Sequence, residues 1–223
     1  QIALYMGRSS LVPMLDAIAT TRMQRSRGAA SVRLGPRGLL DLAQSGSAKA
    51  MLPRMTAGLP EIVFLNTAGG LASGDRLDYR VRLTPGTRAL ATTQTAERAY
   101  RAKDAPARVT LHLAVGEGGW LDWLPQETIL YDGARLRRET TVDLAPGAGC
   151  LLLEPIVLGR IAMGETIRHL HLSDRRIVRQ DGRVIHHDAL ALDDAALSRL
   201  HRPAMLGEAR AMASLALIAP HGP

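Results

Sequence analysis

Short runs in which apolar and polar residues alternate recur along most of this chain, and they limit its possible folds more than any other feature. Residues 77–83 (LDYRVRL), 108–115 (RVTLHLAV) and 166–172 (TIRHLHL) alternate with a period of two, and residues 134–142 and 183–192 repeat the pattern. A β-strand turns successive side chains to opposite faces, so each run suits a strand with one face buried and one in water. Half-buried strands of this kind are typical of antiparallel sheets.

Residues that favour tight turns separate these runs at intervals of roughly ten residues. The clusters TPG, GEGG, APG and QDGR supply the Gly, Pro and Asp that turns need, and QDGR (180–183) predicts a two-residue hairpin. Residues 193–200 predict a helix, because acidic residues begin the segment and an Arg lies near its end. Residues 204–218 favour helix by their Ala, Met and Leu content, although their apolar run could equally be a buried strand.

We therefore predict a mainly β chain of layered antiparallel or β-helix-like sheets with one or two short helices. Residues 1–22 are poorly patterned and are interpreted as an N-terminal extension, whereas residues 23–223 are interpreted as one β domain. With 46% hydrophobic and 22% charged residues, the 223-residue chain has the composition of a soluble globular protein. No apolar stretch approaches the ~20 residues of a membrane span, and no signal peptide is indicated.

The cysteine content and the charge indicate the cellular compartment and the kind of partner. The single cysteine, Cys150, cannot form an internal disulfide, so a buried, inert thiol in a reducing cytoplasm is expected. The net charge is +7, but the basic residues are spread along the chain, and no aromatic residues interleave their densest cluster, which is Arg22, Arg25, Arg27 and Arg33. A nucleic-acid partner is therefore not predicted.

A glycine-rich loop follows the apolar strand EIVFLN. The loop GGLASGD (69–75) lacks the GK[ST] ending of a phosphate-binding loop, which argues against nucleotide binding. Glycines at this density allow a tight turn with close backbone approach, and we expect that turn to aim Asp75 inward.

Two further positions bear on a metal site. Glu154 lies within the aliphatic run LLLEPIVLG, where an ionised carboxylate needs a partner, and Arg160 is the predicted one. The interpretations left open are a structural ion pair and the polar lining of an ion path. His169 and His171 would share one strand face, which permits metal contact but also suits a solvated face, because Leu170 and Leu172 would then face the core.

Four motifs in order resemble the UreD (UreH) family of urease accessory proteins. They are LNTAGGLASGDRLDY, ALATTQTAERAYRA, LDWLPQETILYDGARLRRE and LLEPIVLGRIAMGETIRHLHLSDR, and the resemblance covers nearly the whole chain after the N-terminal extension. In the second motif the chain departs from the family pattern at Glu97 and Arg98. The resemblance also implies that the family's C-terminal part is missing here.

The resemblance implies a mostly β, partly β-helix-like protein that is not an enzyme and has no tightly bound cofactor. Such a protein would act in the cytoplasm with UreF, the GTPase UreG and urease apoprotein, in a hetero-oligomer with two copies of this chain, and would help insert nickel. An internal passage for Ni²⁺ is expected of the family. As transient Ni²⁺ ligands we predict Asp75, Glu154, Glu165 and His169, with Arg160 and Arg98 as a polar path or structural ion pair.

We expect Asp75, Glu154, Arg160 and Glu165 to lie together or along one channel. The alternatives are a β-rich metal-binding or protein-binding module of an unrelated pathway, and a metal-dependent enzyme. An enzyme is disfavoured because no G-x-S-x-G elbow is present and no His neighbours Cys150 in the sequence.

Overall fold

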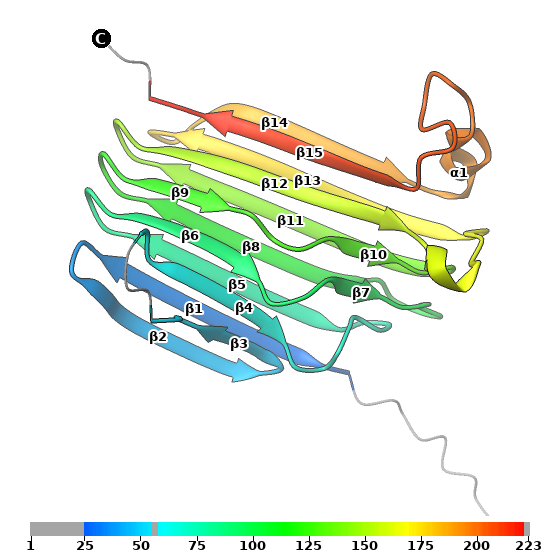
Figure 1. The fold of residues 1–223 in the computed structure, drawn as a ribbon, viewed down its shortest axis with the longest axis horizontal. Helices are drawn as coiled ribbons and strands as arrows, with labels where there is room; N and C mark the ends of the chain where they lie inside the picture. The colour runs from blue at the N-terminus through cyan, green and yellow to red at the C-terminus, as the bar shows by residue number, and fades with distance from the viewer. Residues whose placement is uncertain (1–24, 55–57, 221–223) are drawn as a thin grey trace, which may run out of the picture.

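The computed structural model describes residues 25–54 and 58–220, which form two β-sheets stacked face to face (Figure 1). Sheet 1 has the strand order β14-β13-β11-β8-β5-β1-β2, and sheet 2 has the order β3-β4-β6-β9-β12-β10-β7, with β15 also paired to β12. In chain order the elements are β1 (Arg27–Gly35), β2 (Gly38–Gly46), β3 (Ala48–Met51), β4 (Glu61–Asn66), β5 (Arg76–Leu83), β6 (Arg88–Thr93), β7 (Glu97–Ala99), β8 (Ala107–Val115), β9 (Trp120–Trp123), β10 (Thr128–Leu130), β11 (Ala134–Leu144), β12 (Gly149–Leu158), the 3₁₀ helix η1 (Ile161–Met163), β13 (Leu170–Gln180), β14 (Arg183–Leu192), α1 (Asp194–Leu200) and β15 (Ala211–Ile218).

From β4 to β13 the chain passes back and forth between the two sheets, and neighbouring strands within each sheet run parallel (Figure 1). Among the named strands, antiparallel pairing is confined to the ends of the stack, in β1–β2, β3–β4, β13–β14 and β12–β15. The β-helix-like form of the fold prediction is therefore confirmed, whereas antiparallel pairing of the central strands was wrong. Parallel sheets are usually covered on both faces. Here only the inner faces are covered, so the strands keep the alternation that normally indicates antiparallel pairing.

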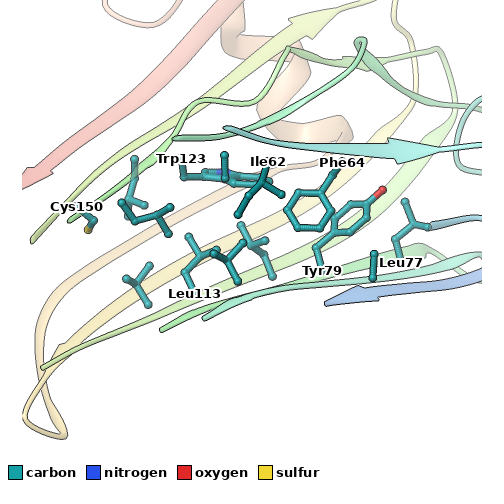
Figure 2. Close-up of a cluster of buried hydrophobic side chains, with 14 of the residues drawn as sticks. Ile62, Phe64, Leu77, Tyr79, Leu113, Trp123 and Cys150 are labelled. Atoms are coloured by element: carbon teal, nitrogen blue, oxygen red, sulfur yellow. The ribbon is translucent and has the colours of Figure 1, made fainter. Parts of the chain in front are cut away.

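The core lies between the two inner faces and is built almost entirely from aliphatic residues. Its few aromatic side chains pack together: the ring centroid of Phe64 lies 4.7 Å from that of Tyr79 and 6.1 Å from that of Trp123 (Figure 2). Cys150 is fully buried in the same layer, as expected from its apolar surroundings. Burial raises the pKa of its thiol to about 12.

Most predicted strands are present. β5 and β8 match the predicted runs within one residue, β14 has the predicted bounds, and β11 extends the predicted strand by two residues. The predicted hairpin joins β13 to β14, with positive φ at Asp181 and Gly182. The strand predicted for 166–172 was wrong in its first part, because β13 begins only at Leu170. The backbone N–H groups of Arg168 and His169 bind the Asp132 side chain instead of a neighbouring strand.

The two helix predictions had different outcomes. α1 forms where expected, and the Asp193 side chain caps it by accepting a hydrogen bond from the Ala196 N–H at 2.8 Å. The helix favoured for 204–218 was wrong. The alternative of a buried strand is confirmed in that β15 is a strand, but Leu215 and Leu217 on it are exposed. The free edge of β12 pairs with this segment, and that tertiary pairing overrides the helix propensity of its alanines.

In the described part of the chain, no helix combines the length and the hydropathy needed to cross a membrane. The predicted N-terminal extension, residues 1–22, lies outside the described residues.

Candidate functional site

The residues predicted to form one polar cluster lie in three separate places. Asp75 lies in the glycine-rich turn before β5, Glu154 lies inside the core on β12, and Arg160, Glu165 and His169 lie on the loop between β12 and β13. The expectation of one joint cluster was therefore wrong. Each place has its own geometry.

Asp75 is buried, as predicted, and both of its carboxylate oxygens are occupied by backbone groups. Oδ1 accepts a hydrogen bond from the Ser26 N–H at 2.7 Å, and Oδ2 accepts one from the Ala72 N–H at 2.7 Å. Gly70 has φ of 152°, and a Cβ there would come within 2.3 Å of the Tyr100 ring. The loop is a tight turn that Asp75 fastens to the start of β1.

Glu154 is buried, as predicted, but its partner is Arg138 rather than Arg160. Glu154 Oε2 lies 2.7 Å from Arg138 Nη1, and Glu154 Oε1 accepts a hydrogen bond from Trp123 Nε1 at 3.0 Å. The prediction of Arg160 was wrong because β12 ends at Leu158. Every second residue of β12 faces inward, as Glu154 does, but Arg160 lies beyond the end of the strand and is exposed.

Arg138 joins Glu154 to further buried charges. Its Nε and Nη2 donate to the two oxygens of Asp174, at 3.1 and 2.6 Å. Arg176 Nη2 lies 3.5 Å from Asp174 and 3.1 Å from Asp188 Oδ2. These five residues (Glu154, Arg138, Asp174, Arg176 and Asp188) are called the internal charge chain below. It runs between the two sheets from β12 to β14.

Burial and pairing act against each other in the internal charge chain. Burial raises the pKa of the Glu154 carboxyl, and the nearby Arg138 and Trp123 offset only part of that rise. Burial works to lower the pKa of Arg138, but Glu154 and Asp174 raise it above its ordinary value. Arg138 therefore stays charged in the core because two carboxylates contact it.

Arg138, Asp174 and Arg176 were not predicted from the sequence. A signal for them was present, because each alternates in phase with buried apolar residues of its own strand. Arg138, for example, lies between the inward-facing Leu136 and Val142 at even spacing. Among the described residues, Thr140 Oγ1 and Arg176 Nε and Nη1 are buried without a hydrogen-bond partner. Buried polar atoms of this kind mark places where ordered water or an ion can bind.

Two small cavities share part of their lining, and the inner one adjoins the internal charge chain. The inner cavity, about 50 Å³, is lined by Trp123, Arg138 and Glu154, and the outer cavity, about 40 Å³, is lined by Asn66 and Arg98. Glu97 lines both cavities, as do Tyr79 and Thr93.

Glu97 is half-buried and was not predicted as a site residue, because nothing in its short strand marks it as facing inward. Its carboxylate accepts hydrogen bonds from Asn66 Nδ2 at 3.2 and 3.3 Å. Burial raises the pKa of Glu97 to about 7, although Asn66 and Arg98 work to lower it. The predicted residue Arg98 lies at the outer cavity with its side chain exposed.

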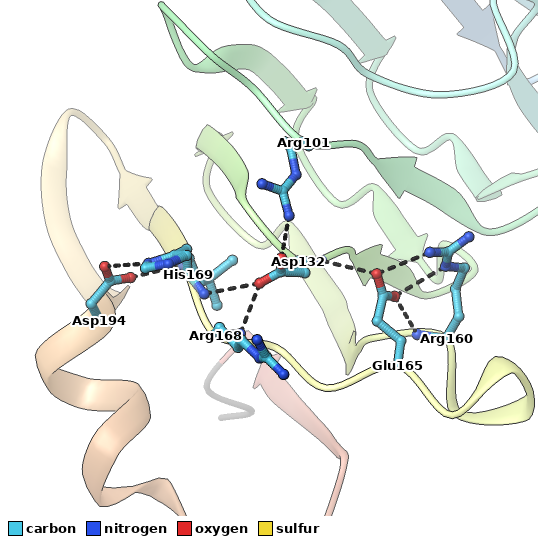
Figure 3. A network of polar contacts seen from close by, with 8 residues as sticks. Arg101, Asp132, Arg160, Glu165, Arg168, His169 and Asp194 are labelled. Carbon is cyan, nitrogen blue, oxygen red and sulfur yellow. Dashed lines mark hydrogen bonds and ion pairs between the residues drawn. The ribbon is translucent and has the colours of Figure 1, made fainter.

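The third place is an edge of the sheets where the distinctive motifs of the sequence meet (Figure 3). We call it the motif edge and define it by Tyr100, Arg101, Tyr131, Asp132, Arg160 and Glu165. Arg160 and Glu165 form a two-point ion pair, with Nε and Nη2 each 3.0 Å from a carboxylate oxygen. The expectation that these two residues can satisfy each other is confirmed.

Asp132 is the centre of the motif edge. One of its oxygens accepts hydrogen bonds from the Arg168 and His169 N–H groups at 2.8 and 3.0 Å, and the other pairs with Arg101 (Figure 3). Its own N–H donates to Glu165 Oε1 at 3.3 Å. Burial works to raise the pKa of the Asp132 carboxyl, but these hydrogen bonds and Arg101 hold it below its ordinary value.

The histidines do not form the joint site that their spacing allowed. His169 precedes β13 and its Nδ1 lies 3.0 Å from Asp194 Oδ2, whereas His171 lies on the exposed outer face of the strand. Leu170 and Leu172 face the core, as expected. Within residues 25–54 and 58–220, no three His, Cys, Asp or Glu residues are placed to hold one metal ion together.

These features define a two-layered, β-solenoid-like protein with a charged interior and a polar motif edge. A sequence model of the UreD urease accessory protein family matches residues 25–222. The chain belongs to this UreD family, as the motif resemblance predicted.

The similarity to individual relatives extends over most of the chain. It is 87% identical to the urease accessory protein UreD of Paracoccus denitrificans, covering 96% of this chain and 77% of that protein. It is 54% identical to UreD of Cereibacter sphaeroides, covering 95% and 77%. It is 51% identical to UreD of a Jannaschia species, covering 92% and 76%.

Proposed function

We propose that this protein is a non-enzymatic factor of urease maturation, a cytoplasmic scaffold that acts with UreF and UreG to load urease apoprotein with nickel. The observation that carries the proposal is the match to the UreD family over residues 25–222, together with 87% identity to a urease accessory protein. In this proposal Ni²⁺ is a cargo that binds only transiently. The assembly contains two copies of the chain.

The interior of the sandwich supports a role in handling a cation. The internal charge chain places three carboxylates between the sheets. The inner cavity is lined by Glu154, and Glu97 lines both the inner and the outer cavity. Carboxylate oxygens and water are suitable transient ligands of a divalent ion. Since the four predicted ligands lie apart, we propose successive weak contacts rather than one closed metal site.

The test is reconstitution of urease in cells that lack their own UreD. Urease subunits, UreF and UreG are expressed with or without this chain, and the nickel content and activity of purified urease are measured. We expect nickel loading to depend on this chain, and we expect the chain to co-purify with UreF and the urease subunits. Full nickel loading without the chain would contradict the proposed function. Dependence without any co-purification would favour an indirect role.

Two variants of the chain separate a role in handling nickel from a role in assembling the complex. Glu97→Gln keeps the shape of the side chain and removes its charge between the two cavities, while Glu127→Gln changes a carboxylate outside both cavity linings by the same charge. We expect Glu97→Gln to lower nickel loading while the complex with the partners persists. Equal loading by both variants would exclude Glu97 from the path of the ion.

A further inference from the structure

Two hollows lie next to each other at the motif edge. One, about 560 Å³, is lined by Lys103, Arg135 and His171 among others, and the second, about 660 Å³, is lined by Arg160 and Arg168 among others. Arg101 lines both hollows, so they adjoin each other and together form one surface. Figure 3 shows Asp132 between the groups that belong to the two hollows. We call this surface the double hollow.

The acidic groups of the double hollow are already engaged by the protein itself. Asp132 accepts from two backbone N–H groups, Glu165 from those of Asp132 and Arg160, Asp193 from that of Ala196, and Asp194 from that of Leu170. Each of these carboxylates therefore already has a hydrogen-bond donor from the backbone, and Asp132 and Glu165 are also paired with Arg101 and Arg160, which weakens their repulsion of an incoming anion.

The basic groups are less engaged. Within the described part of the chain, Lys103, Arg135 and Arg168 have no carboxylate within ion-pair distance, and Lys103 and Arg168 are exposed. Arg101 and Arg160 are paired, but their side chains are 63% and 45% exposed, so each guanidinium still offers donors to a partner. The pairing fixes their orientation in advance, which lowers the entropy cost of binding.

Apolar and aromatic groups border these cations. The Tyr100 and Tyr131 rings meet edge to face at 5.2 Å, and the Arg160 guanidinium lies 4.6 Å above the Tyr131 ring. Beside Arg160, the short helix η1 presents Ile161 and Met163, which are 60% and 73% exposed. Tyr, Arg and Met are among the residues that are enriched at protein–protein interfaces relative to the rest of the surface.

We propose that the double hollow is a docking surface for an acidic segment of a partner protein. Carboxylates of that segment would contact Lys103 and Arg168, and an apolar side chain would contact Ile161 and Met163. A nucleic acid fits less well, because its phosphates would contact the cations but would leave the apolar side chains of Ile161 and Met163 uncovered. The proposal rests on the accessory role proposed above and assigns a surface to it.

The test measures binding of the whole chain to purified UreF and to purified urease apoprotein at low and high salt. The double variant Lys103→Glu with Arg168→Glu reverses two exposed cations of the double hollow. We expect it to bind at least one partner roughly tenfold more weakly, or worse, than the wild type at about 0.1 M salt. That difference should shrink at about 1 M salt, where exposed charges are screened.

A matched control has the same change in net charge. Arg33→Glu with Arg82→Glu alters two exposed arginines that are neighbours on β1 and β5, at the opposite ends of the strands from the motif edge. This control should bind like the wild type, and both variants should unfold at wild-type temperatures.

The outcomes distinguish the two proposals. Wild-type affinity of the Lys103 and Arg168 double variant for both partners would overturn the docking surface and leave the accessory role standing. A wild-type chain that binds neither protein would contradict both. Equal weakening by the double variant and the control would show that net charge, rather than the double hollow, governs binding, and would also overturn the inference.

Discussion

Arg138 of β11 and Glu154 of β12 form an ion pair across the two sheets, with Nη1 and Oε2 2.7 Å apart and both side chains less than a tenth exposed. Arg138 also binds Asp174 at two points, so a single guanidinium contacts two buried carboxylates. A buried pair adds less stability than its Coulomb attraction suggests, but removing one partner leaves an uncompensated charge. Arg138 is therefore the position where a substitution should harm this core most.

Replacing Arg138 with Met should lower the free energy of unfolding at pH 7 by about 3 kcal/mol or more. Burial already raises the pKa of Glu154, and loss of Arg138 should raise it further. A carboxyl whose pKa is higher in the folded than in the unfolded state loses stability as pH rises through the folded value. The variant should therefore lose less stability at pH 5 than at pH 7.

Urea denaturation at both pH values measures this effect. Glu139→Gln is the control, because Glu139 lies on the same strand but faces outward in an exposed pair with Arg137. Such a pair contributes at most about 1 kcal/mol. A loss in the Arg138→Met variant that is no greater at pH 7 than at pH 5 would refute the charge argument.

We expect that substitution of Asp75 mainly lowers the stability of the fold. Asp75→Ala removes the acceptor for the Ser26 and Ala72 N–H groups, which should cost about 2 kcal/mol of folding free energy. Asp78→Ala, which removes an exposed partner of Arg80 on the same strand, should cost much less. Thermal unfolding of the two variants compares these costs. Equal melting temperatures would show that the turn does not depend on Asp75.

The Cys150 thiol should be unreactive in the folded protein. Its burial raises its pKa to about 12, so almost no thiolate exists at pH 8 and the sulfur lies inside the core. Mass spectrometry after treatment with iodoacetamide should find no adduct in buffer and complete alkylation in denaturant. Rapid modification of the native protein would show that this layer of the core opens readily.

The sequence predicted what depends on local pattern and missed what depends on which strands become neighbours. Alternation located β5, β8 and β14, and the aliphatic flanks of Glu154 correctly indicated its burial. Parallel pairing could not be predicted in this way, because a strand with one wet face alternates whichever way its neighbour runs.

The partner of Glu154 shows the same limit at the level of a single residue. Arg138 reaches Glu154 across the two sheets, whereas the prediction of Arg160 used proximity in the chain. The inward parity of Arg138 with Leu136 was a usable signal, but only once the inner face of β11 was known. Glu97 had no such signal, because its burial comes from the segments that surround the two cavities.

The contribution of Glu97 to the pH dependence of stability can be isolated by comparing the wild type with a variant that lacks this carboxyl. Its pKa is raised to about 7 from an ordinary 4.5, because burial disfavours the charged form. Between about pH 4.5 and pH 7, the folded state therefore keeps a proton on Glu97 that the unfolded state has released. The resulting stabilisation is fully present below about pH 4.5 and is lost as pH rises through about 7. Glu97→Gln cannot titrate, so the wild type should lose stability relative to this variant between pH 5 and pH 8, by about 1–3 kcal/mol.

Urea denaturation of both proteins across this range measures the difference, in which every other titrating group cancels. A difference that does not change with pH would mean that Glu97 is already ionised in the folded protein at pH 5, and that Asn66 and Arg98 outweigh its burial.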